Sequence, residues 1–331
     1  MINVAIVGAT GLVGRTMLRV LEEHQVQVGE LRLLASQRSA GMVIHGLGRE
    51  TVVRELTPES FAGMDYALFS AGGAISKVYA PIAASAGCVA IDNSSVWRMD
   101  PAVPLVVPEV NPGDVHAHSG IIANPNCSTI QLVVAVKPLI DMYGAKRLVV
   151  STYQSPSGAG QQGVDQLAAE LAGDEPQSRI TPHTLAMNTV FHTINELNGS
   201  SEEEVKMMRE TRRILHLSEL PIAVTCVRVP VLGGHAESVA LETIRPCDPD
   251  QARALLAAQE GIVVVDDPAT HTYPMPATSK NTDPVYVGRI RRDTSVENGL
   301  LLWVVADNLR KGAATNAVQI LQLLTNTTKS S

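Results

Sequence analysis

A glycine loop near the start of the chain constrains its fold more than any other feature. Gly8, Gly11 and Gly14 recur at intervals of three, with an apolar run, Asn3–Gly8, before the loop and a helical pattern, Val13–Glu23, after it. In a strand–loop–helix unit the first glycine permits the tight turn, the second lets backbone approach a pyrophosphate, and the third lets helix pack on strand. An incidental glycine turn has the same spacing, but the flanking strand and helix favour a nucleotide-binding loop. Its expected members are Gly8, Thr10, Gly11, Leu12, Val13 and Gly14.

Short apolar strands and helices alternate through the first half of the chain. The strands expected after the loop are Leu31–Ser36, Thr51–Leu56, Tyr66–Ala71 and Val89–Asp92, with a helix at Ala74–Ala86. Continuous apolar strands separated by helices are typical of a doubly wound parallel sheet. The sequence therefore predicts an α/β, Rossmann-type domain in this half.

The pattern changes from Lys146 onward, where the strands become longer and several alternate with polar residues. Strands are expected at Arg147–Gln154, Ile222–Val231, Ser238–Ile244, Ile262–Asp266, Val285–Ile290 and Leu300–Val305, and helices at Gln161–Leu171, Glu202–Leu215, Pro249–Gln259 and Gly312–Leu324. Alternation is typical of a mixed or antiparallel sheet that is open on one face. Because 331 residues exceed one typical core, we expect this half to form a second, α+β domain.

Composition and charge exclude several classes of function. A net charge of −7 and an aromatic content of 3% argue against nucleic acid as a partner. No apolar stretch is long enough to span a bilayer, and the N-terminus begins a strand without a signal-type run. The four cysteines, Cys88, Cys127, Cys226 and Cys247, form no CxxC pair, so neither a disulfide framework nor a metal site is indicated. We expect a cytoplasmic protein.

The residues after the second strand bear on the choice of cofactor. NAD-binding folds usually offer an acidic residue there to the ribose 2′-hydroxyl. This chain has Ser36, Arg38 and Ser39 instead, and no acid. An arginine with neighbouring hydroxyls suits a 2′-phosphate, which favours NADP, although Arg38 also fits a solvated surface side chain. Ser70 and Gly72 end another strand, where ligands of open α/β sheets also bind.

Cys127 lies between a short apolar strand, Ser119–Ala123, and an expected helix, Ser128–Ile140. A thiol at a helix N-terminus is close to unpaired backbone N–H groups and the positive end of the helix dipole. This position lowers the pKa of a thiol and favours the nucleophilic thiolate, and the same N–H groups can stabilise an oxyanion. The position of Cys127 alone is equally compatible with a structural role as a small, buried apolar side chain.

Two polar residues in the second half are difficult to explain as structure alone. Arg228 shares a strand face with the apolar Ile222 and Val224, so its guanidinium needs an anion, which either a protein carboxylate or a substrate can supply. His235 follows two glycines on the approach to a new strand. Histidine is the side chain best suited to proton transfer near neutral pH, but a lone histidine is often only a hydrogen-bonded structural residue.

On the expected helix Glu202–Leu215, Glu210 and Arg213 are three residues apart and share a face. This pair fits either an exposed ion pair or two groups that bind a charged substrate.

Together these features resemble those of aspartate-semialdehyde dehydrogenases, over nearly the whole chain. The matching segments are Gly8–Gly14, Asp92–Asp100, Val106–Asn111, Pro125–Thr129, Ser151–Gln154, Ser157–Gly160, Glu210–Arg213, Arg228–Val231, Gly234–Glu237 and Asp307–Ala314. No single segment is specific to this family, but the combination is.

The resemblance implies a role for each site residue. Cys127 would be the nucleophile, His235 the general acid and base, and Gln154 the residue that positions the thioacyl intermediate. Arg228 would bind the α-carboxylate of the substrate and Glu210 its ammonium group. The residues that remain are Arg98, Asn126 and Arg213 for the acyl phosphate, and Ser157, Gly158 and Asn308 for the cofactor.

The resemblance also implies an assembly and a division into domains. The family forms homodimers or dimer-based tetramers. An NADP-binding domain would cover residues 1–126 and be completed by the C-terminal helix, about 311–331, while residues 127–310 would form the catalytic and dimerisation domain.

The reaction implied is the NADPH-dependent reductive dephosphorylation of L-aspartyl 4-phosphate to L-aspartate 4-semialdehyde through a cysteine thioester. It serves the synthesis of lysine and diaminopimelate, methionine, threonine and isoleucine. Two alternatives remain: reduction of a related acyl phosphate such as N-acetylglutamyl phosphate, or a non-catalytic NADP-binding role.

Two positions depart from the family pattern. The family usually has lysine where this chain has Arg213, which bears on phosphate affinity. The stretch Met187–Asn195 also lacks an expected proline, which bears only on the conformation of a loop.

Overall fold

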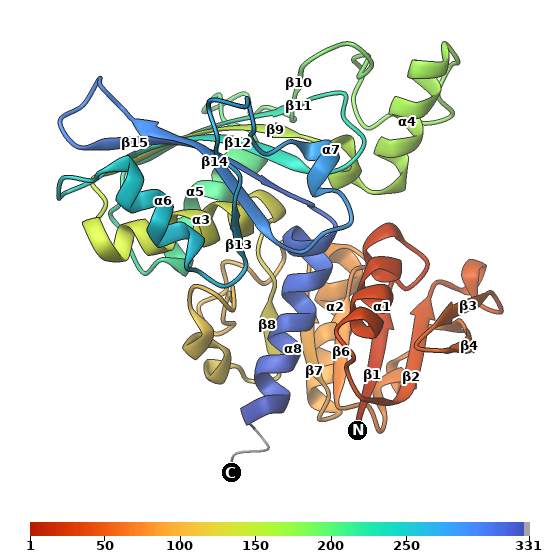
Figure 1. The fold of residues 1–331 in the computed structure, drawn as a ribbon. Coiled ribbons are helices and arrows are strands. Elements are labelled where there is room, and N and C mark those ends of the chain that lie inside the picture. Colours follow the sequence, from red (N-terminus) through yellow and green to blue (C-terminus); the bar gives the residue numbers. More distant parts are fainter. Residues whose placement is uncertain (328–331) are drawn as a thin grey trace. The chain divides into compact units, whose positions relative to one another are not determined.

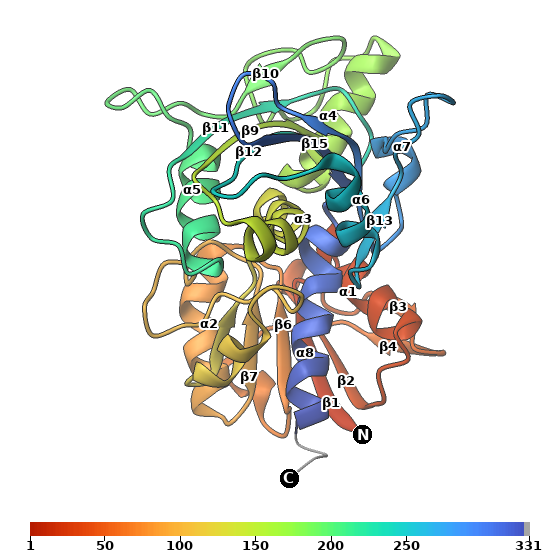
Figure 2. The same ribbon diagram turned by 60° about the vertical axis from the view of Figure 1, so that its left-hand side comes forward.

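The computed structural model describes residues 1–327, and the side chains of residues 1–325 (Figures 1 and 2). It divides into two compact units, of which the first contains Met1–Asn126 and the chain from Ala313 onward, and the second contains Cys127–Gly312. The predicted nucleotide domain extends to residue 331, and its residues 328–331 lie outside the described part of the chain.

A six-stranded parallel sheet forms the centre of the first unit, with strand order β5-β2-β1-β6-β7-β8. Its strands are β1 (Ile2–Val7), β2 (Val28–Ala35), β5 (Arg54–Glu55), β6 (Tyr66–Phe69), β7 (Val89–Asp92) and β8 (Ile121–Ala123). The chain crosses from one side of β1 to the other between β5 and β6. The carboxyl ends of β1 and β6 therefore flank the topological switch point, where ligands of doubly wound sheets bind. The predicted fold class is confirmed.

Helices cover both faces of this sheet. Alternate residues of β1 belong to two cores: Val4 and Ile6 pack with helices α1 (Leu12–Glu23) and α8 (Thr315–Thr327), whereas Ala5 and Val7 belong to the core on the other face. The helix α2 (Gly73–Ser85) contributes Ala80 and Ala83 to that second core. Figure 1 shows α8 among the elements of this unit, so the last described helix completes the N-terminal sheet domain.

The prediction of a single strand at Thr51–Leu56 is wrong. Its first part belongs to a hairpin of β3 (Val43–Gly46) and β4 (Arg49–Val52), and only Arg54–Glu55 joins the main sheet. The turn residues Leu47 and Gly48 both have positive φ, 53° and 69°. Such a two-residue turn matches the twist of an antiparallel hairpin, which explains why the chain reverses here.

The second unit is built on a seven-stranded mixed sheet of strand order β10-β11-β9-β12-β15-β14-β13. Its strands are β9 (Arg147–Gln154), β10 (Val190–Phe191), β11 (Ile222–Arg228), β12 (His235–Glu242), β13 (Ile262–Val264), β14 (Val285–Arg292) and β15 (Gly299–Ala306). The helices are α3 (Cys127–Tyr143), α4 (Gln161–Ala172), α5 (Glu202–Ile214), α6 (Pro249–Ala257) and the short α7 (Pro276–Ser279). The predicted mixed sheet is confirmed.

Several boundaries differ from the expected ones. β12 begins at His235 rather than at Ser238, because the positive φ values of Gly233 and Gly234, 100° and 78°, complete the turn before it. The last helix begins with π-helical turns over Arg310–Ala314, so α8 starts at Thr315. Within residues 1–327, no helix is both long and apolar enough to cross a bilayer.

Candidate active site

Three of the predicted residues lie in one row across adjacent strands of the second unit. In the register of the sheet, Gln154 at the end of β9 is the partner of Arg228 on β11 and of His235 on β12. Partners on neighbouring strands are separated by about 5 Å and project to the same face. The sheet therefore brings together residues that are up to 81 positions apart in the sequence.

Cys127 is the first residue of α3, the helix that packs against β12 and β15 in this unit. Its side chain is half-buried, and its charge when ionised interacts with the Arg228 guanidinium. Gly312 lies against it: a Cβ at this glycine would be 2.8 Å from the Cys127 Cβ. Only glycine leaves room for the thiol at this position.

Burial and hydrogen bonding fix the protonation state of His235. Its side chain has no exposed surface, and burial lowers the pKa of the imidazole to about 4. The backbone N–H of Ser155 donates to Nδ1 over 3.0 Å. Because Nδ1 accepts, the proton of the neutral ring is at Nε2. A Cβ at Gly158 would be 3.4 Å from that nitrogen, so Nε2 faces the Ser155–Gly158 turn.

The amide of Gln154 links three elements. Its Nε2 lies 2.9 Å from the hydroxyl of Ser128 on α3, 3.3 Å from the hydroxyl of Thr152, and 3.3 Å from Oε1 of Glu203 on α5. Only 2% of Gln154 is exposed, so these contacts hold its amide in a defined position. Ser128 follows Cys127, and the network therefore fixes the start of α3 relative to the strand row.

The structure places a different acidic residue at the row from the one the sequence suggested. Glu203, in the first turn of α5, is next to Gln154, whereas Glu210 is seven residues further along, or about 10 Å along the helix axis. The orientation of α5 confirms this separation: Glu204 accepts from the backbone N–H of Cys226, near the Arg228 end of β11, and Arg212 donates to the carbonyl of Leu220, before the other end.

Lys206 is the basic residue one turn after Glu203 on α5. It follows Glu203 by three residues, the spacing that Arg213 has from Glu210, and its charge contributes to lowering the pKa of His192 beside Arg228. Glu210 is 1% exposed, and Arg213 is in the last turn of the helix. The helix contains the i,i+3 pattern of an acid and a base twice, and sequence alone did not show which copy is next to the row.

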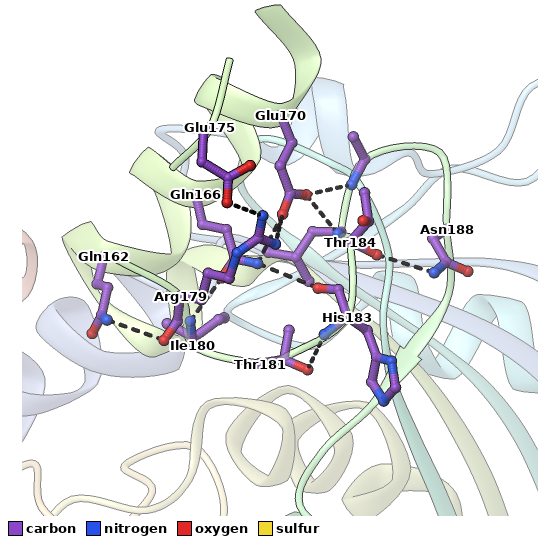
Figure 3. A network of polar contacts seen from close by, with 12 residues as sticks. Gln162, Gln166, Glu170, Glu175, Arg179, Ile180, Thr181, His183, Thr184 and Asn188 are labelled. Carbon is purple, nitrogen blue, oxygen red and sulfur yellow. Dashed lines mark hydrogen bonds and ion pairs between the residues drawn. The ribbon is translucent and has the colours of Figure 1, made fainter. Parts of the chain in front are cut away.

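An open cavity of about 560 Å³ lies next to Arg228. Ile180–His183 and Asn188–Ile194 line it together with Arg228, and Nη2 of Arg228 is 3.3 Å from Nδ1 of His192. The neighbouring α4 holds the segment 180–194 in place (Figure 3). Glu170 accepts from the backbone N–H groups of Leu185 and Ala186, at 2.6 and 2.9 Å.

Asn308 is buried beside the turn that leads to β12. Its Oδ1 accepts from the hydroxyl of Ser157 and the backbone N–H of Gly234, at 3.2 and 3.1 Å. Its Nδ2 is buried without an acceptor among the described residues. An amide donor in this state fits a polar ligand group such as a carboxamide.

In the first unit, the glycine loop has the geometry of a dinucleotide-binding turn. Gly8 has a φ of 86°, and a Cβ there would lie 2.9 Å from the backbone N of Ala71. A Cβ on Gly14 would lie 2.3 Å from the carbonyl oxygen of Gly8. Gly11 is the N-cap of α1, with no side chain to block the helix N-terminus. This geometry is compatible with the predicted role of the loop in binding a pyrophosphate.

The other predicted cofactor residues of this unit lie at the ends of the same strands. Ser36, Arg38 and Ser39 are in or next to a 3-10 turn after β2, and Arg38 is exposed. The Ser70 hydroxyl donates to the carbonyl of Val7 over 3.1 Å, and Gly72 is the N-cap of α2. Thr10, Leu12 and Val13 lie in or directly after the glycine loop.

Arg98 and Asn126 are both buried in the first unit, at 7% and 6% exposure. Arg98 donates from Nε to the carbonyl of Asn124 and from Nη2 to that of Asn93, over 2.9 and 2.8 Å. These bonds hold the strand end that leads into Asn126.

Glu237 is a buried acid that the sequence analysis did not single out. It lies two residues after His235 on the same face of β12 and has no exposed surface. Burial raises the pKa of its carboxyl well above the usual value, with the Gln131 amide acting in the opposite direction. Gln131 is one turn after Cys127 on α3, and its Nε2 is 3.5 Å from the carbonyl of His235. The sequence spacing places Glu237 near His235, but its full burial depends on the packing of α3 against β12 and was not recognisable from the sequence.

Comparison with known proteins agrees with this geometry. Residues 3–118 match the family described as "Semialdehyde dehydrogenase, NAD binding domain", and residues 136–311 match "Semialdehyde dehydrogenase, dimerisation domain". The chain is 54% identical to aspartate-semialdehyde dehydrogenase of Aquifex aeolicus, over 97% of each chain.

Two solved structures extend the comparison. Aspartate semialdehyde dehydrogenase II of Vibrio cholerae, complexed with ASA, has a TM-score of 0.94 at 45% identity and covers 98% of both chains. The Candida albicans enzyme with NADP has a TM-score of 0.78 at 25% identity, also over 98% of both. The matches confirm the resemblance found in the sequence motifs: the chain belongs to the aspartate-semialdehyde dehydrogenase family.

Proposed function

We propose that the protein is a phosphorylating, NADP-dependent aspartate-semialdehyde dehydrogenase. In the biosynthetic direction it would convert L-aspartyl 4-phosphate to L-aspartate 4-semialdehyde and phosphate, for the synthesis of lysine and diaminopimelate, methionine, threonine and isoleucine. The observation that carries the proposal is the row of Arg228, Gln154 and His235 in the unit whose first helix begins with Cys127.

Covalent catalysis follows from the position of Cys127. A thiolate at a helix N-terminus can attack the acyl phosphate carbon, with phosphate as the leaving group, and this leaves a thioester on sulfur. Bound NADPH would supply the hydride for the thioester carbon. His235 has its ring proton at Nε2, so it can donate a hydrogen bond to the oxygen that gains charge in this step. Gln154 would orient the acyl group.

The substrate head group would be bound by opposite charges. Arg228 remains our candidate for the α-carboxylate. For the ammonium group we propose Glu203 in place of Glu210, because Glu203 is the acid that contacts Gln154. For phosphate we propose Lys206 in place of Arg213, since it follows Glu203 by one turn. Arg98 and Asn126 stay as proposed ligands of the acyl phosphate.

NADP is the proposed cofactor. The glycine loop leaves room for a pyrophosphate, and Arg38 offers an exposed cation beside two serines where NAD-binding proteins place an acid. The Candida albicans relative is described with NADP. Ser157, Gly158 and Asn308 would bind the nicotinamide end, which is supported by the buried Nδ2 of Asn308 that has no acceptor within the described residues.

We also propose a homodimer, because residues 136–311 match a dimerisation domain, and a cytoplasmic location, with which the four free thiols are consistent.

One assay tests the proposal. Purified protein should reduce NADP when given aspartate semialdehyde and phosphate, and more slowly with NAD. N-acetylglutamate semialdehyde should be a poor substrate, because it has no ammonium group for Glu203. Activity with that compound alone would favour the related acyl-phosphate reductase. No activity with either would favour a non-catalytic relative.

A further inference from the structure

His192 was not among the predicted site residues, yet it is the immediate neighbour of Arg228. It follows β10, whose Val190 pairs with Arg228 in the sheet, and it lines the cavity next to that arginine. The guanidinium Nη2 and the imidazole Nδ1 are 3.3 Å apart. An arginine can only donate, so Nδ1 is the acceptor.

This contact fixes the state of the His192 ring. Burial, followed by the charge of Arg228, lowers the pKa of His192 to about 4, so the ring is neutral at physiological pH. With Nδ1 accepting, the single ring proton is on Nε2. That nitrogen is buried and has no acceptor among the described residues, and the same is true of Nη1 of Arg228.

Two neighbouring residues that line the same cavity thus each have a buried N–H donor without an acceptor in the described part of the chain. Buried donors in native proteins are normally paired, because an unpaired one loses its bond to water without replacement. A carboxylate has two oxygens and matches two such donors. The acid Glu203, whose charge acts on both Arg228 and His192, would then face the ammonium group of the same ligand.

We propose that His192 and Arg228 together bind the α-carboxylate of the substrate, each through one nitrogen. His192 is thus a specificity-determining residue that favours substrates carrying this carboxylate. The inference rests on the proposed function for the identity of the substrate.

Hydrogen bonds and ion pairs hold the segment that precedes His192 against α4. Glu170 binds two backbone N–H groups of the segment, Gln166 accepts from the N–H of Ile180 over 2.7 Å, and Arg179 bridges Glu170 and Glu175 (Figure 3). These contacts fix the first part of the wall independently of His192. A substitution at His192 should therefore leave the wall in place.

The test compares three variants and two aldehydes. His192→Leu removes both the donor and the acceptor, whereas His192→Gln keeps an amide N–H and an oxygen that can accept from Arg228. His183→Leu is the matched control, because His183 lines the same cavity but is exposed. The aldehydes are aspartate semialdehyde and 3-aminopropanal, which lacks only the α-carboxylate.

We expect His192→Leu to lower kcat/KM for aspartate semialdehyde by about 10- to 100-fold, as for a lost hydrogen bond to a charged group. For 3-aminopropanal the change should be less than about threefold, and KM for phosphate and for NADP should stay the same. His192→Gln should retain activity within about threefold of the parent, and His183→Leu should equal the parent. Equal losses for both aldehydes in His192→Leu would overturn the proposal, since they would indicate a purely structural role.

A binding measurement separates this inference from the proposed reaction. Calorimetric titration of Cys127→Ala protein with aspartate semialdehyde, in the presence of NADP, reports affinity without turnover. Adding His192→Leu should weaken that affinity by the same 10- to 100-fold factor. An unchanged affinity would contradict the role of His192, whether or not the parent enzyme turns over. A parent protein without NADP reduction would contradict only the proposed function.

Discussion

Burial acts in opposite directions on two residues of β12. It lowers the pKa of His235 to about 4 and raises the pKa of Glu237 well above its usual value, so burial disfavours the charged form of each side chain. The site thus avoids an isolated buried charge on this strand. In the proposed reaction, the charges would come instead from Arg228, Glu203 and the thiolate of Cys127.

The state of Glu237 gives a prediction for stability. Its folded pKa is raised, so the folded protein holds a proton that the unfolded chain releases above about pH 4.5, and stability falls as pH rises from there. Glu237→Gln keeps the shape without the titration. We expect its free energy of unfolding to exceed that of the parent by an amount that grows between pH 5 and pH 8, measured by urea unfolding. A difference that does not depend on pH would show that Glu237 is ionised when folded.

A second prediction separates the two acids of α5. Glu203→Gln should raise KM for aspartate semialdehyde by roughly 10- to 100-fold, because the ammonium group loses a charged hydrogen bond. Glu210→Gln should leave that KM within about threefold of the parent, since Glu210 is two turns away. Steady-state kinetics of both variants decide the matter. A raised KM in Glu210→Gln with an unchanged KM in Glu203→Gln would instead identify Glu210 as the residue that binds the ammonium group.

At the scale of elements, the structure shows why α5 presents Glu203 and not Glu210. The helix starts with a capping box, in which the Ser201 hydroxyl accepts from the backbone N–H of Glu204 and the Glu204 carboxylate accepts from the N–H of Ser201. The same carboxylate accepts from the N–H of Cys226. The cap therefore ties the first turn of the helix to β11, and Glu203 lies between the tied residues.

This cap is testable. Ser201→Ala should lower the free energy of unfolding by about 0.5–2 kcal/mol, the usual effect of a lost N-cap. KM for aspartate semialdehyde should rise as the first turn frays. Ser218→Ala, at an exposed serine after the same helix, is the control and should change neither quantity. Equal unfolding midpoints for both variants and the parent would show that the cap contributes nothing.

Much of the fold was predictable from the sequence because its signals are local. The glycine loop and the apolar strands predicted the parallel sheet, and β7 and β9 have the expected bounds. The hairpin of β3 and β4 was missed because its turn, at Leu47 and Gly48, depends on a left-handed leucine that no sequence pattern reveals.

The site was less predictable because it depends on distant pairings. The motifs identified the row residues Gln154, Arg228 and His235, but not how β11, β9 and β12 align them. Glu237 and His192 escaped notice for the same reason. The environment of each side chain depends on a neighbour on another element, namely Gln131 for Glu237 and Arg228 for His192.

At the scale of the whole molecule, the two units divide the chemistry. The unit around the parallel sheet contains the glycine loop, Arg38 and Arg98, and the unit around the mixed sheet contains Cys127, the proposed nucleophile, and the strand row. α8 belongs to the first unit, where Asn316 donates to Oδ1 of Asn124 over 2.7 Å. The chain thus returns to its N-terminal sheet after completing the second unit.

The central claim is that the reaction passes through an acyl group on Cys127, and a burst experiment tests it most directly. The protein is mixed with aspartate semialdehyde and NADP without phosphate, and NADPH is followed at early times while the protein is digested and its acylated peptide identified by mass spectrometry. We predict a burst of about one NADPH per protomer, an acyl group on the peptide that contains Cys127, and steady turnover only after phosphate is added. Cys127→Ala protein should show neither the burst nor the label. NADPH formation by Cys127→Ala at a rate near that of the parent, or an acyl group on another residue, would contradict the account.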